Sequence, residues 1–270
     1  MCSECSNLWA QVRVGLLYND WVLPSEFHRG RVAVVLVRPR NPLNIGAAAR
    51  AMANFGFTGL ALVAPYEPHW REARSAVGAP ELLQGATECA TLAQAVSGCG
   101  LVVGTATLAH RKPGQPVLQL PALAPLVAAK LESASRAALV FGPEKHGLTR
   151  EDLSYCHVLV EIPTESRQPS MNLGQAVAVC LYELARSGAA PKTQLPLSVE
   201  PAPQAASGSL DLLAGVIEET MIACGYSPAA MRAANRLDLR RMLRRLSIAE
   251  SDAHRVLRLF RRILWRIRRS

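Results

Sequence analysis

The segment VAVVLVRPRNPLNIGAAARAMANFG, residues 32–56, passes from an apolar run directly into a helical pattern. The run VAVVLV is continuously hydrophobic and rich in valine, as is typical of a strand buried on both faces of a sheet. Asn41, Pro42 and Asn44 follow where a helix would begin, because asparagine is a favoured N-cap and proline suits the first turn. We therefore predict a buried strand that leads at once into a helix.

The same alternation continues along the chain and predicts an α/β fold with a mostly parallel sheet covered by helices on both sides. Short apolar runs predict strands at Val32–Val37, Leu60–Ala64, Leu101–Thr105, Ala138–Phe141 and Val158–Ile162. The patterns between them predict helices at Ile45–Asn54, Glu72–Gly85, Leu92–Val96, Ala122–Ser133, Arg150–Tyr155 and Asn172–Arg186.

Composition divides the chain into four parts. Residues 31–186 hold the α/β pattern, and residues 1–30 precede it as an extension to which we assign no function. Residues 187–209 are dominated by Pro, Ala, Ser and Gly and show no period, which indicates a linker. Residues 210–270 predict a small basic helical domain.

Two helices are expected in the basic domain, at Leu210–Cys224 and Ile248–Arg269. The motif SIAE favours a capping box at the start of the second, with Ser247 as N-cap and Glu250 reaching back to it. Apolar residues recur at helical spacing along this last helix, and arginines fill much of the remaining surface. Such a helix either lies on a membrane or docks its apolar face on protein and offers its arginines to phosphate.

The positive charge is concentrated at one end. The formal net charge is +9, yet residues 231–270 alone contain thirteen arginines, no lysine and three acids. The rest of the chain is therefore close to neutral, and the basic end is expected to face a polyanion. No transmembrane run, signal peptide, zinc spacing or disulfide framework is expected from the sequence, so we predict a cytoplasmic protein without a metal site.

Four polar loops follow predicted strands: RPRNPLNIGAAAR, ATLAHRKPGQP, GPEKHGLT and PTESRQPSMNLGQA. Ligands of parallel sheets bind beyond the carboxyl ends of the strands, so these loops are expected to form one site. Local structural roles stay open for the same residues. Asn41 or Asn44 can cap the first helix, Gly142 and Gly147 can serve turns with positive φ, and Ser170 or Asn172 can cap a later helix. No dinucleotide or Walker A fingerprint is present.

The segments NPLNIGAAARAMANFGF, LVFGPEKHGLT and IPTESRQPSMNLGQAV resemble the three motifs of SpoU-type ribose 2′-O-methyltransferases of the SPOUT superfamily. They occur in the family's order, each just after a predicted strand. The first and third segments, with the basic helical end, are most similar to the TrmJ branch, which methylates tRNA. The resemblance covers residues 31–186 closely and residues 205–270 loosely.

This resemblance implies a C-terminal trefoil knot in the α/β domain, a homodimer and S-adenosyl-L-methionine as methyl donor. The knot would involve the loops around 105–107, 142–148 and 162–173. The residues that match the family's cofactor-binding positions are Thr105, Ala106, Thr107, Gly142, Ile162, Ser170 and Met171. Glycine fits such a position because a side chain would block close approach of the backbone.

The resemblance also implies catalytic roles for Asn44, Arg50, Glu144, Ser170 and Asn172. The family's arginine, here Arg50, is the proposed activator of the 2′-hydroxyl, although a guanidinium is normally never deprotonated. Stabilisation of the developing alkoxide is an equally good role for it. Asn44 would orient catalytic groups, Glu144 would hold an arginine through a bidentate pair, and Ser170 and Asn172 would position cofactor or arginine by hydrogen bonds.

Some positions depart from the family's pattern. Pro143 stands where relatives of this branch often carry arginine, and Met171 replaces the common leucine. The loop after Thr105 keeps a basic pair without the usual spacing. The RNA contacts that we predict are Arg38, Arg111, Lys112, Arg240, Arg241 and Arg244.

The predicted reaction is methylation of a ribose 2′-hydroxyl in tRNA, at a cytidine or uridine at the 5′ end of the anticodon loop. Two alternatives stay open: the same chemistry on ribosomal RNA, and a non-catalytic RNA-binding protein that keeps the fold. We expect no DNA partner and no membrane partner.

Overall fold

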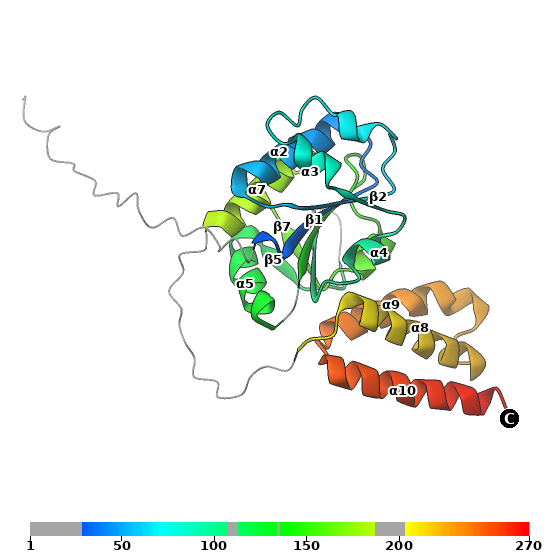
Figure 1. Ribbon diagram of the computed structural model, residues 1–270. Coiled ribbons are helices and arrows are strands. Elements are labelled where there is room, and N and C mark those ends of the chain that lie inside the picture. The colour runs from blue at the N-terminus through cyan, green and yellow to red at the C-terminus, as the bar shows by residue number, and fades with distance from the viewer. Residues whose placement is uncertain (1–28, 107–112, 134–135, 187–202, 270) are drawn as a thin grey trace, which may run out of the picture.

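The computed structural model describes residues 29–106, 113–133, 136–186 and 203–269. Figure 1 shows an α/β body and, below it in that view, a layer of helices from the C-terminal end. The predicted linker at 187–209 lies largely outside the described residues.

The described part of the α/β body contains a seven-stranded sheet in the order β3-β2-β1-β6-β4-β7-β5, and every pairing is parallel. The five predicted strands are confirmed to within one residue as β1 (Val32–Val37), β2 (Gly59–Val63), β4 (Leu101–Thr105), β6 (Ala137–Phe141) and β7 (Val158–Glu161). The two edge strands, β3 (Thr87–Cys89) and β5 (Val117–Gln119), are additional. Both are three residues long and partly exposed, so neither carries the apolar run of a buried strand.

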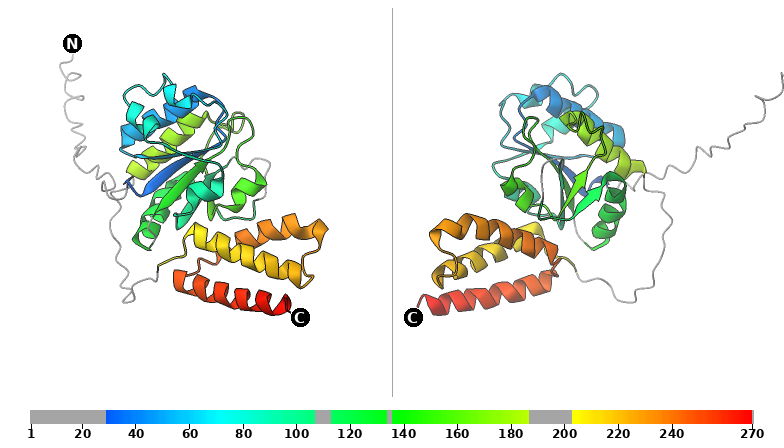
Figure 2. Two further views of the ribbon diagram at one scale, coloured as in Figure 1. Left: turned by 45° about the vertical axis from the view of Figure 1, so that its right-hand side comes forward. Right: turned by 180° about the vertical axis from the view of Figure 1, so that it is seen from behind.

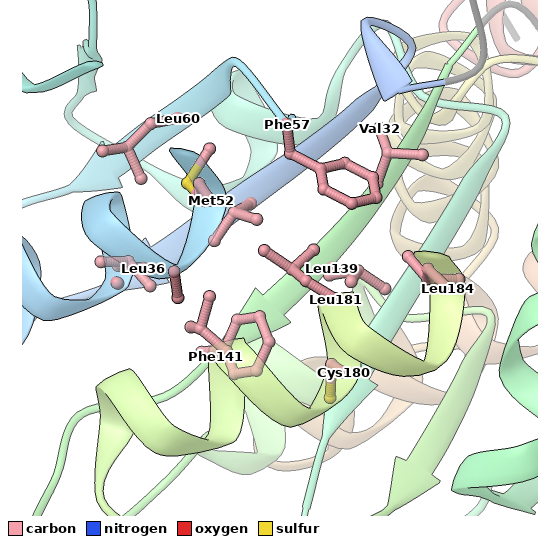
Figure 3. Close-up of a cluster of buried hydrophobic side chains, with 14 of the residues drawn as sticks. Val32, Leu36, Met52, Phe57, Leu60, Leu139, Phe141, Cys180, Leu181 and Leu184 are labelled. Atoms are coloured by element: carbon pink, nitrogen blue, oxygen red, sulfur yellow. The ribbon is translucent and has the colours of Figure 1, made fainter. Parts of the chain in front are cut away.

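Alternate residues of the central strands enter two separate cores. Val34 and Leu36 of β1 pack under α2 (Pro42–Phe55), α5 (Leu123–Ser133) and α7 (Leu173–Arg186). Val35 and Val37 face the other way, toward α4 (Leu92–Val96) and α6 (Arg150–Ser154). Figure 3 shows the first core, where Phe57, Phe141 and Leu181 lie together between the sheet and the two long helices. The prediction that helices cover both sides of the sheet is thus confirmed.

Helix α2 begins at Pro42, three residues before the predicted start at Ile45, and of the two candidate caps Asn41 is the N-cap. The side chain of Asn41 accepts a hydrogen bond from the Leu43 amide at 2.9 Å. Asn44 is the third residue of the helix, and its side-chain amide is available to other partners. Gly56 ends the helix in the left-handed region, at φ 73°.

Helices α2 and α7 pack closely against each other. A Cβ at Gly174 would lie 2.7 Å from the Cβ of Ala47, so glycine is required at this crossing. The contact fixes the start of α7 beside the start of α2, and it thereby brings the first and third sequence motifs together.

The predicted helix at Glu72–Gly85 is wrong. The segment forms a 3₁₀ turn, η1 (Trp70–Glu72), and a short helix, α3 (Pro80–Gln84). Gly78 between them has φ 76°, outside the helical region, and Pro80 suits a first helical turn. Trp70 is fully buried, and its indole nitrogen donates to Glu88 at 3.3 Å, so tertiary packing holds this irregular segment.

The C-terminal layer contains α8 (Ser207–Ala223), η4 (Ala229–Met231), α9 (Arg232–Arg245) and α10 (Glu250–Ile267). Leu213, Ile217 and Leu243 lie in its separate hydrophobic core. Helix α8 begins three residues before its prediction, at Ser207, within the predicted linker. Helix α9 was not predicted, because its sequence is strongly polar and only Leu239 and Leu243 among its apolar residues are buried.

The predicted capping box of the last helix is wrong. Ala249 is the N-cap of α10, and Ser247 has φ 47°. Glu250 instead accepts hydrogen bonds from the Ala206 amide at 3.0 Å and the Ser209 hydroxyl at 2.6 Å. The carboxylate therefore caps the first turn of α8, a helix more than forty positions earlier in the chain, and joins it to α10.

The C-terminal layer docks on the side of the sheet that α4 and α6 cover, as both views of Figure 2 show. The amides of Ser207 and Gly208 at the start of α8 donate to the carbonyls of Cys99 and Ser97 at 2.9 and 2.8 Å. These carbonyls lie just beyond the end of α4. Each helix end thus supplies groups that the other leaves unpaired.

Candidate active site

A cavity of about 310 Å³ lies at the carboxyl ends of β4, β6 and β7. Its walls are three of the four loops that the sequence placed at this edge of the sheet. All of the predicted cofactor-binding residues that the structure describes line it: Thr105, Ala106, Gly142, Ile162, Ser170 and Met171. Thr107 lies outside the described residues. Three of the four predicted loops, those after β4, β6 and β7, therefore converge on one space.

Gly142 opens the loop that forms one wall of the cavity. A Cβ at this position would lie 2.3 Å from the amide nitrogen of Leu148 and 2.4 Å from the carbonyl carbon of Gly147. The loop thus folds back on its own first residue, which only glycine permits. Gly147 serves the turn with φ 62°, as one interpretation of the sequence allowed, whereas Gly142 does not have a positive φ.

Three of the predicted catalytic residues form one hydrogen-bond network. The Asn44 amide nitrogen donates to a carboxylate oxygen of Glu144 at 2.9 Å. The Asn172 amide nitrogen donates to the Asn44 amide oxygen at 3.0 Å. One residue comes from each of the three motifs, so the network joins the starts of α2 and α7 to the loop after β6. Glu144 also lines the cavity, which places the network at its rim.

Glu144 accepts two further hydrogen bonds, from the amides of Arg40 and Asn41 at 3.2 Å each. Partial burial raises the pKa of this carboxyl, but the bonds from Asn44 and the two amides outweigh burial and leave the pKa below its ordinary value. Glu144 is thus a carboxylate at neutral pH. Within the described residues of one chain, Glu144 does not form the expected bidentate pair with an arginine side chain, and it binds an asparagine and backbone amides instead.

Asn172 performs two tasks at once. Its amide oxygen accepts from the Gly174 and Gln175 amides at 2.9 and 3.4 Å, as a helix cap does, while its nitrogen holds Asn44. Asn172 therefore caps α7, as one interpretation of the sequence allowed, and also belongs to the hydrogen-bond network. Ser170 lines the cavity two residues earlier.

Arg50 stands apart from the other predicted catalytic residues. It lies exposed on α2 and does not line the cavity of its own chain. Within the described parts of the chain, the side chain of Arg50 forms no hydrogen bond or ion pair. The separation follows from helix geometry, because Arg50 is six residues after Asn44 and points from a different face.

A family model named "SpoU rRNA Methylase family" matches residues 31–182, more than half of the chain. The chain belongs to the SpoU methylase family. The match spans all three motifs, the whole sheet, helix α2 and most of helix α7.

Among curated SpoU relatives, the chain is 43% identical over 155 residues to the tRNA (cytidine/uridine/adenosine-2′-O-)-methyltransferase TrmJ of Pseudomonas aeruginosa strain UCBPP-PA14. That alignment covers 57% of this chain and 60% of the relative, which is less than two thirds of its length. The chain is 34% identical to the tRNA (cytidine/uridine-2′-O-)-methyltransferase TrmJ of Klebsiella pneumoniae, over 72% of this chain and 80% of the relative.

Among solved structures, the crystal structure of TrmJ from Z. mobilis ZM4 is similar with a TM-score of 0.73 and 30% identity. The superposition covers 87% of this chain and 98% of that chain. That coverage is wider than the match to the family model, which ends within α7.

The basic residues predicted to contact RNA have different surroundings in this SpoU chain. Arg38 follows β1 with φ 46° and pairs with the buried carboxylate of Asp152, although 42% of its side chain stays exposed. Arg240 lies over the ring of Tyr155 and is 16% exposed, and Arg241 is 24% exposed beside Asp238. Arg111 and Lys112 lie outside the described residues.

The predicted RNA contact of Arg244 is wrong. Its side chain is 1% exposed and donates to the Tyr155 carbonyl at 3.0 Å and to Asp211 at 2.8 Å. Arg244 thus ties α9 to the end of α6 and to α8. The pattern of apolar residues could not predict that Arg244 is buried. Helix α9 is polar on most of its surface, and the residue that it buries where it meets the sheet domain is an arginine.

The sequence missed Arg40 and Asn41 as contributors to the site. They act through backbone amides that bind Glu144, a role that leaves no trace in side-chain type. Lys145 and His146 line the cavity from the same loop as Glu144 and are exposed.

In the parts of the chain that the structure describes, no cluster of His, Cys, Asp and Glu suits a metal ion. Within those parts, no helix is both long and apolar enough to cross a bilayer.

Proposed function

We propose that this SpoU methylase transfers a methyl group from S-adenosyl-L-methionine to a ribose 2′-hydroxyl of tRNA. The observation that carries the proposal is the network of Asn44, Glu144 and Asn172 at the rim of a cavity lined by the motif residues. The curated relatives are named as tRNA 2′-O-methyltransferases, and this supports tRNA as the substrate. The nucleotide we propose is a cytidine or uridine at the 5′ end of the anticodon loop.

The cavity fits the proposed donor. Its lining combines apolar residues, among them Leu148, Leu173 and Ile162, with polar residues such as Thr105 and Ser170. Such a mixture suits a ligand with an adenine ring and polar ribose and amino-acid groups. When bound, the donor supplies an electrophilic methyl group, so the protein's own tasks are alignment and the handling of one proton.

Within this proposal, the network positions the backbone of the loop and does not move the proton itself. The Glu144 carboxylate accepts three hydrogen bonds and has a depressed pKa, both of which make it a poor general base. Arg50 is the residue that would face the 2′-hydroxyl and stabilise negative charge on its oxygen as the proton leaves. Ser170, at the cavity wall, is placed to orient the bound ligand.

We further propose a homodimer in which Arg50 serves the cavity of the partner subunit. Arg50 is exposed and does not line its own cavity, so a second copy of the α2 surface beside the cavity would supply the missing group. The trefoil knot and a cytoplasmic location belong to the same proposal. The resemblance to SPOUT enzymes supports the knot, and the tRNA substrate supports the location.

The test is methyl transfer from labelled donor to purified tRNA and, separately, to purified ribosomal RNA. We expect label in tRNA, and mapping of 2′-O-methyl positions is expected to place it at one nucleotide of the anticodon loop. The family's name refers to rRNA, and label that enters only rRNA would contradict the tRNA assignment.

Arg50→Ala tests whether the protein is an enzyme of this type at all. We expect turnover to fall by about a hundredfold or more, as for loss of one donor that stabilises transition-state charge, while tRNA still binds. Unchanged turnover would reject the catalytic assignment. Mixing Arg50→Ala with a cavity variant, Ser170→Trp, is expected to restore part of the activity if the two sites share residues across a dimer.

A further inference from the structure

Helix α10 carries an aromatic side chain between two arginines. The guanidinium groups of Arg262 and Arg269 lie over the ring of Trp265, at 4.5 and 4.2 Å from its centroid. They come from one turn before and one turn after the tryptophan, so they bracket it along the helix. Leu264, next to it in sequence, is buried and anchors the helix, whereas Trp265 is 39% exposed. We call these three residues the Arg-Trp stack.

Stacking on an indole holds a guanidinium in place without using its N–H groups. The edges of Arg262 and Arg269 therefore stay free to bind oxygen atoms, and less side-chain freedom is lost when they do so. Neither arginine pairs with a carboxylate within the residues that the structure describes. Other arginines of the same region are paired: Arg255 with Asp252 and Arg268 with Glu219.

A shallow open groove of about 480 Å³ runs beside the stack, between α8 and α10. Its lining includes three arginines and the ring of Trp265. The one acidic residue of the lining, Glu219, forms an ion pair with Arg268 at an N–O distance of 2.9 Å. The lining residues are Val216, Glu219, Arg261, Leu264, Trp265, Arg268 and Arg269. The groove thus presents positive charge next to an aromatic edge.

The apolar face of α10 is already used. The core that α10 shares with α8 and α9 contains Ala253 and the partly buried Val256, Leu257 and Phe260. Leu264 is buried as well. Leu259 and Ile263 stay exposed at its flank. A helix that lies in a membrane needs its apolar face for the acyl chains, so this arrangement favours a polar polyanion over a lipid surface. Figures 1 and 2 show α10 on the side of the C-terminal layer that faces away from the sheet.

We propose that the Arg-Trp stack and the adjoining groove bind the sugar-phosphate backbone of the substrate RNA. This inference rests on the proposed function, and it moves the RNA contact from α9, whose Arg244 is buried, to the outer face of α10. Trp265 acts as a positioning residue, because it fixes the two guanidinium groups that touch phosphate. The ligand is a folded RNA long enough to contact both α10 and the cavity.

The test is equilibrium binding of purified full-length tRNA by the whole chain, without methyl donor, over a series of salt concentrations. Trp265→Leu removes no charge, yet we expect binding weaker by roughly fivefold, because two stacked cations lose their support. The slope of log K against log salt is expected to become shallower by about 0.7 to 0.9 for each phosphate that the variant no longer binds. Trp265→Phe keeps a ring and is expected to retain most of the affinity.

Arg262→Ala and Arg255→Ala form a matched pair, because each removes one positive charge from α10. We expect the first to weaken tRNA binding clearly more than the second. Equal losses would overturn the proposal in favour of net charge alone, and so would Trp265→Leu with wild-type affinity and salt slope. Circular dichroism and thermal unfolding of each variant check that α10 stays folded.

Two further outcomes separate this inference from the proposed function. Binding of ribosomal RNA but not tRNA, with the same dependence on Trp265, would reject the tRNA substrate and support the stack. Binding to phosphatidylglycerol vesicles that depends on Trp265, with RNA binding unchanged, would overturn the stack as an RNA site. In kinetics, Trp265→Leu is expected to raise KM for tRNA and leave kcat unchanged, the opposite of Arg50→Ala.

Discussion

At the scale of single residues, the charge of Glu144 is what fixes the geometry of the site. Its carboxylate accepts hydrogen bonds from Asn44 and from the amides of Arg40 and Asn41. Glu144→Gln keeps the shape but removes the charge and one acceptor oxygen. We expect kcat/KM to fall about tenfold or more, since a hydrogen bond to a charged group is worth roughly 1.5–3 kcal/mol. Steady-state methylation of tRNA measures this, and Glu165→Gln, on an exposed turn, is the control.

A second residue-scale prediction concerns Asp152, which binds Arg38 and caps α6 through Thr149. Burial raises its pKa, but the bonds from Arg38 and Thr149 outweigh burial and leave the pKa below the ordinary value. The carboxylate therefore stabilises the fold above the usual aspartate pKa, about 3.9, and this contribution disappears as pH falls through the lower folded value.

Asp152→Asn is expected to lower the free energy of unfolding by about 2 kcal/mol at neutral pH. Urea unfolding from pH 7 downward should show the difference from wild type shrinking below about pH 4. A difference that stays constant to the acid limit would show that the carboxylate's charge contributes nothing.

Sequence reasoning at this scale found Asn44, Glu144 and Asn172 because motif resemblance places residues even where their partners are unknown. It failed for the partners. Glu144 binds backbone amides, and whether Arg244 is exposed depends on how α9 meets the sheet domain. Neither property is written in the type or spacing of the residues themselves.

At the scale of elements, the conformation of the loop after β6 requires a glycine at position 142, because no Cβ fits there. Gly142→Ala would drive a Cβ into the backbone of Gly147 and Leu148, so the loop must move. We expect loss of most donor binding, measured by calorimetry, with the sheet intact. Gly215→Ala is the control: it lies in the middle of α8 with open space around it, and we expect about 0.5–1 kcal/mol of added stability. Normal donor binding by Gly142→Ala would show that the loop tolerates the shift.

Elements were predicted where a long apolar run or a clear helical period exists, as in β1, β6 and α7. Strands β3 and β5 pair on one side only, and their residues read as loop. The SIAE motif predicted a local capping box, but Glu250 caps α8 instead. A local motif competes with any distant partner that the fold brings near, and sequence alone does not show that partner.

At the scale of the whole molecule, Arg244 links the C-terminal layer to the sheet domain. Arg244→Ala would leave Asp211 and the Tyr155 carbonyl without their partner, at a cost of about 3 kcal/mol. We expect a lower unfolding temperature for the C-terminal layer and a higher KM for tRNA, with donor binding unchanged. Arg244→Lys is expected to rescue little, because one ammonium cannot replace a planar fork with several partners. A single unfolding transition at the wild-type temperature would contradict this role.

The order of the strands also bears on how the chain assembles as it is synthesised. Strand β1 lies between β2 and β6, and its partner β6 begins about a hundred residues later in the chain. Until that later segment leaves the ribosome, one edge of β1 has no neighbouring strand. The hydrophobic core beneath α2 also lacks the residues that β6 and α7 contribute to it. Parallel pairings between such distant segments form slowly, whereas contacts within the C-terminal helices are mostly local. The nascent chain is therefore expected to need protection from aggregation until β6 and α7 have been made.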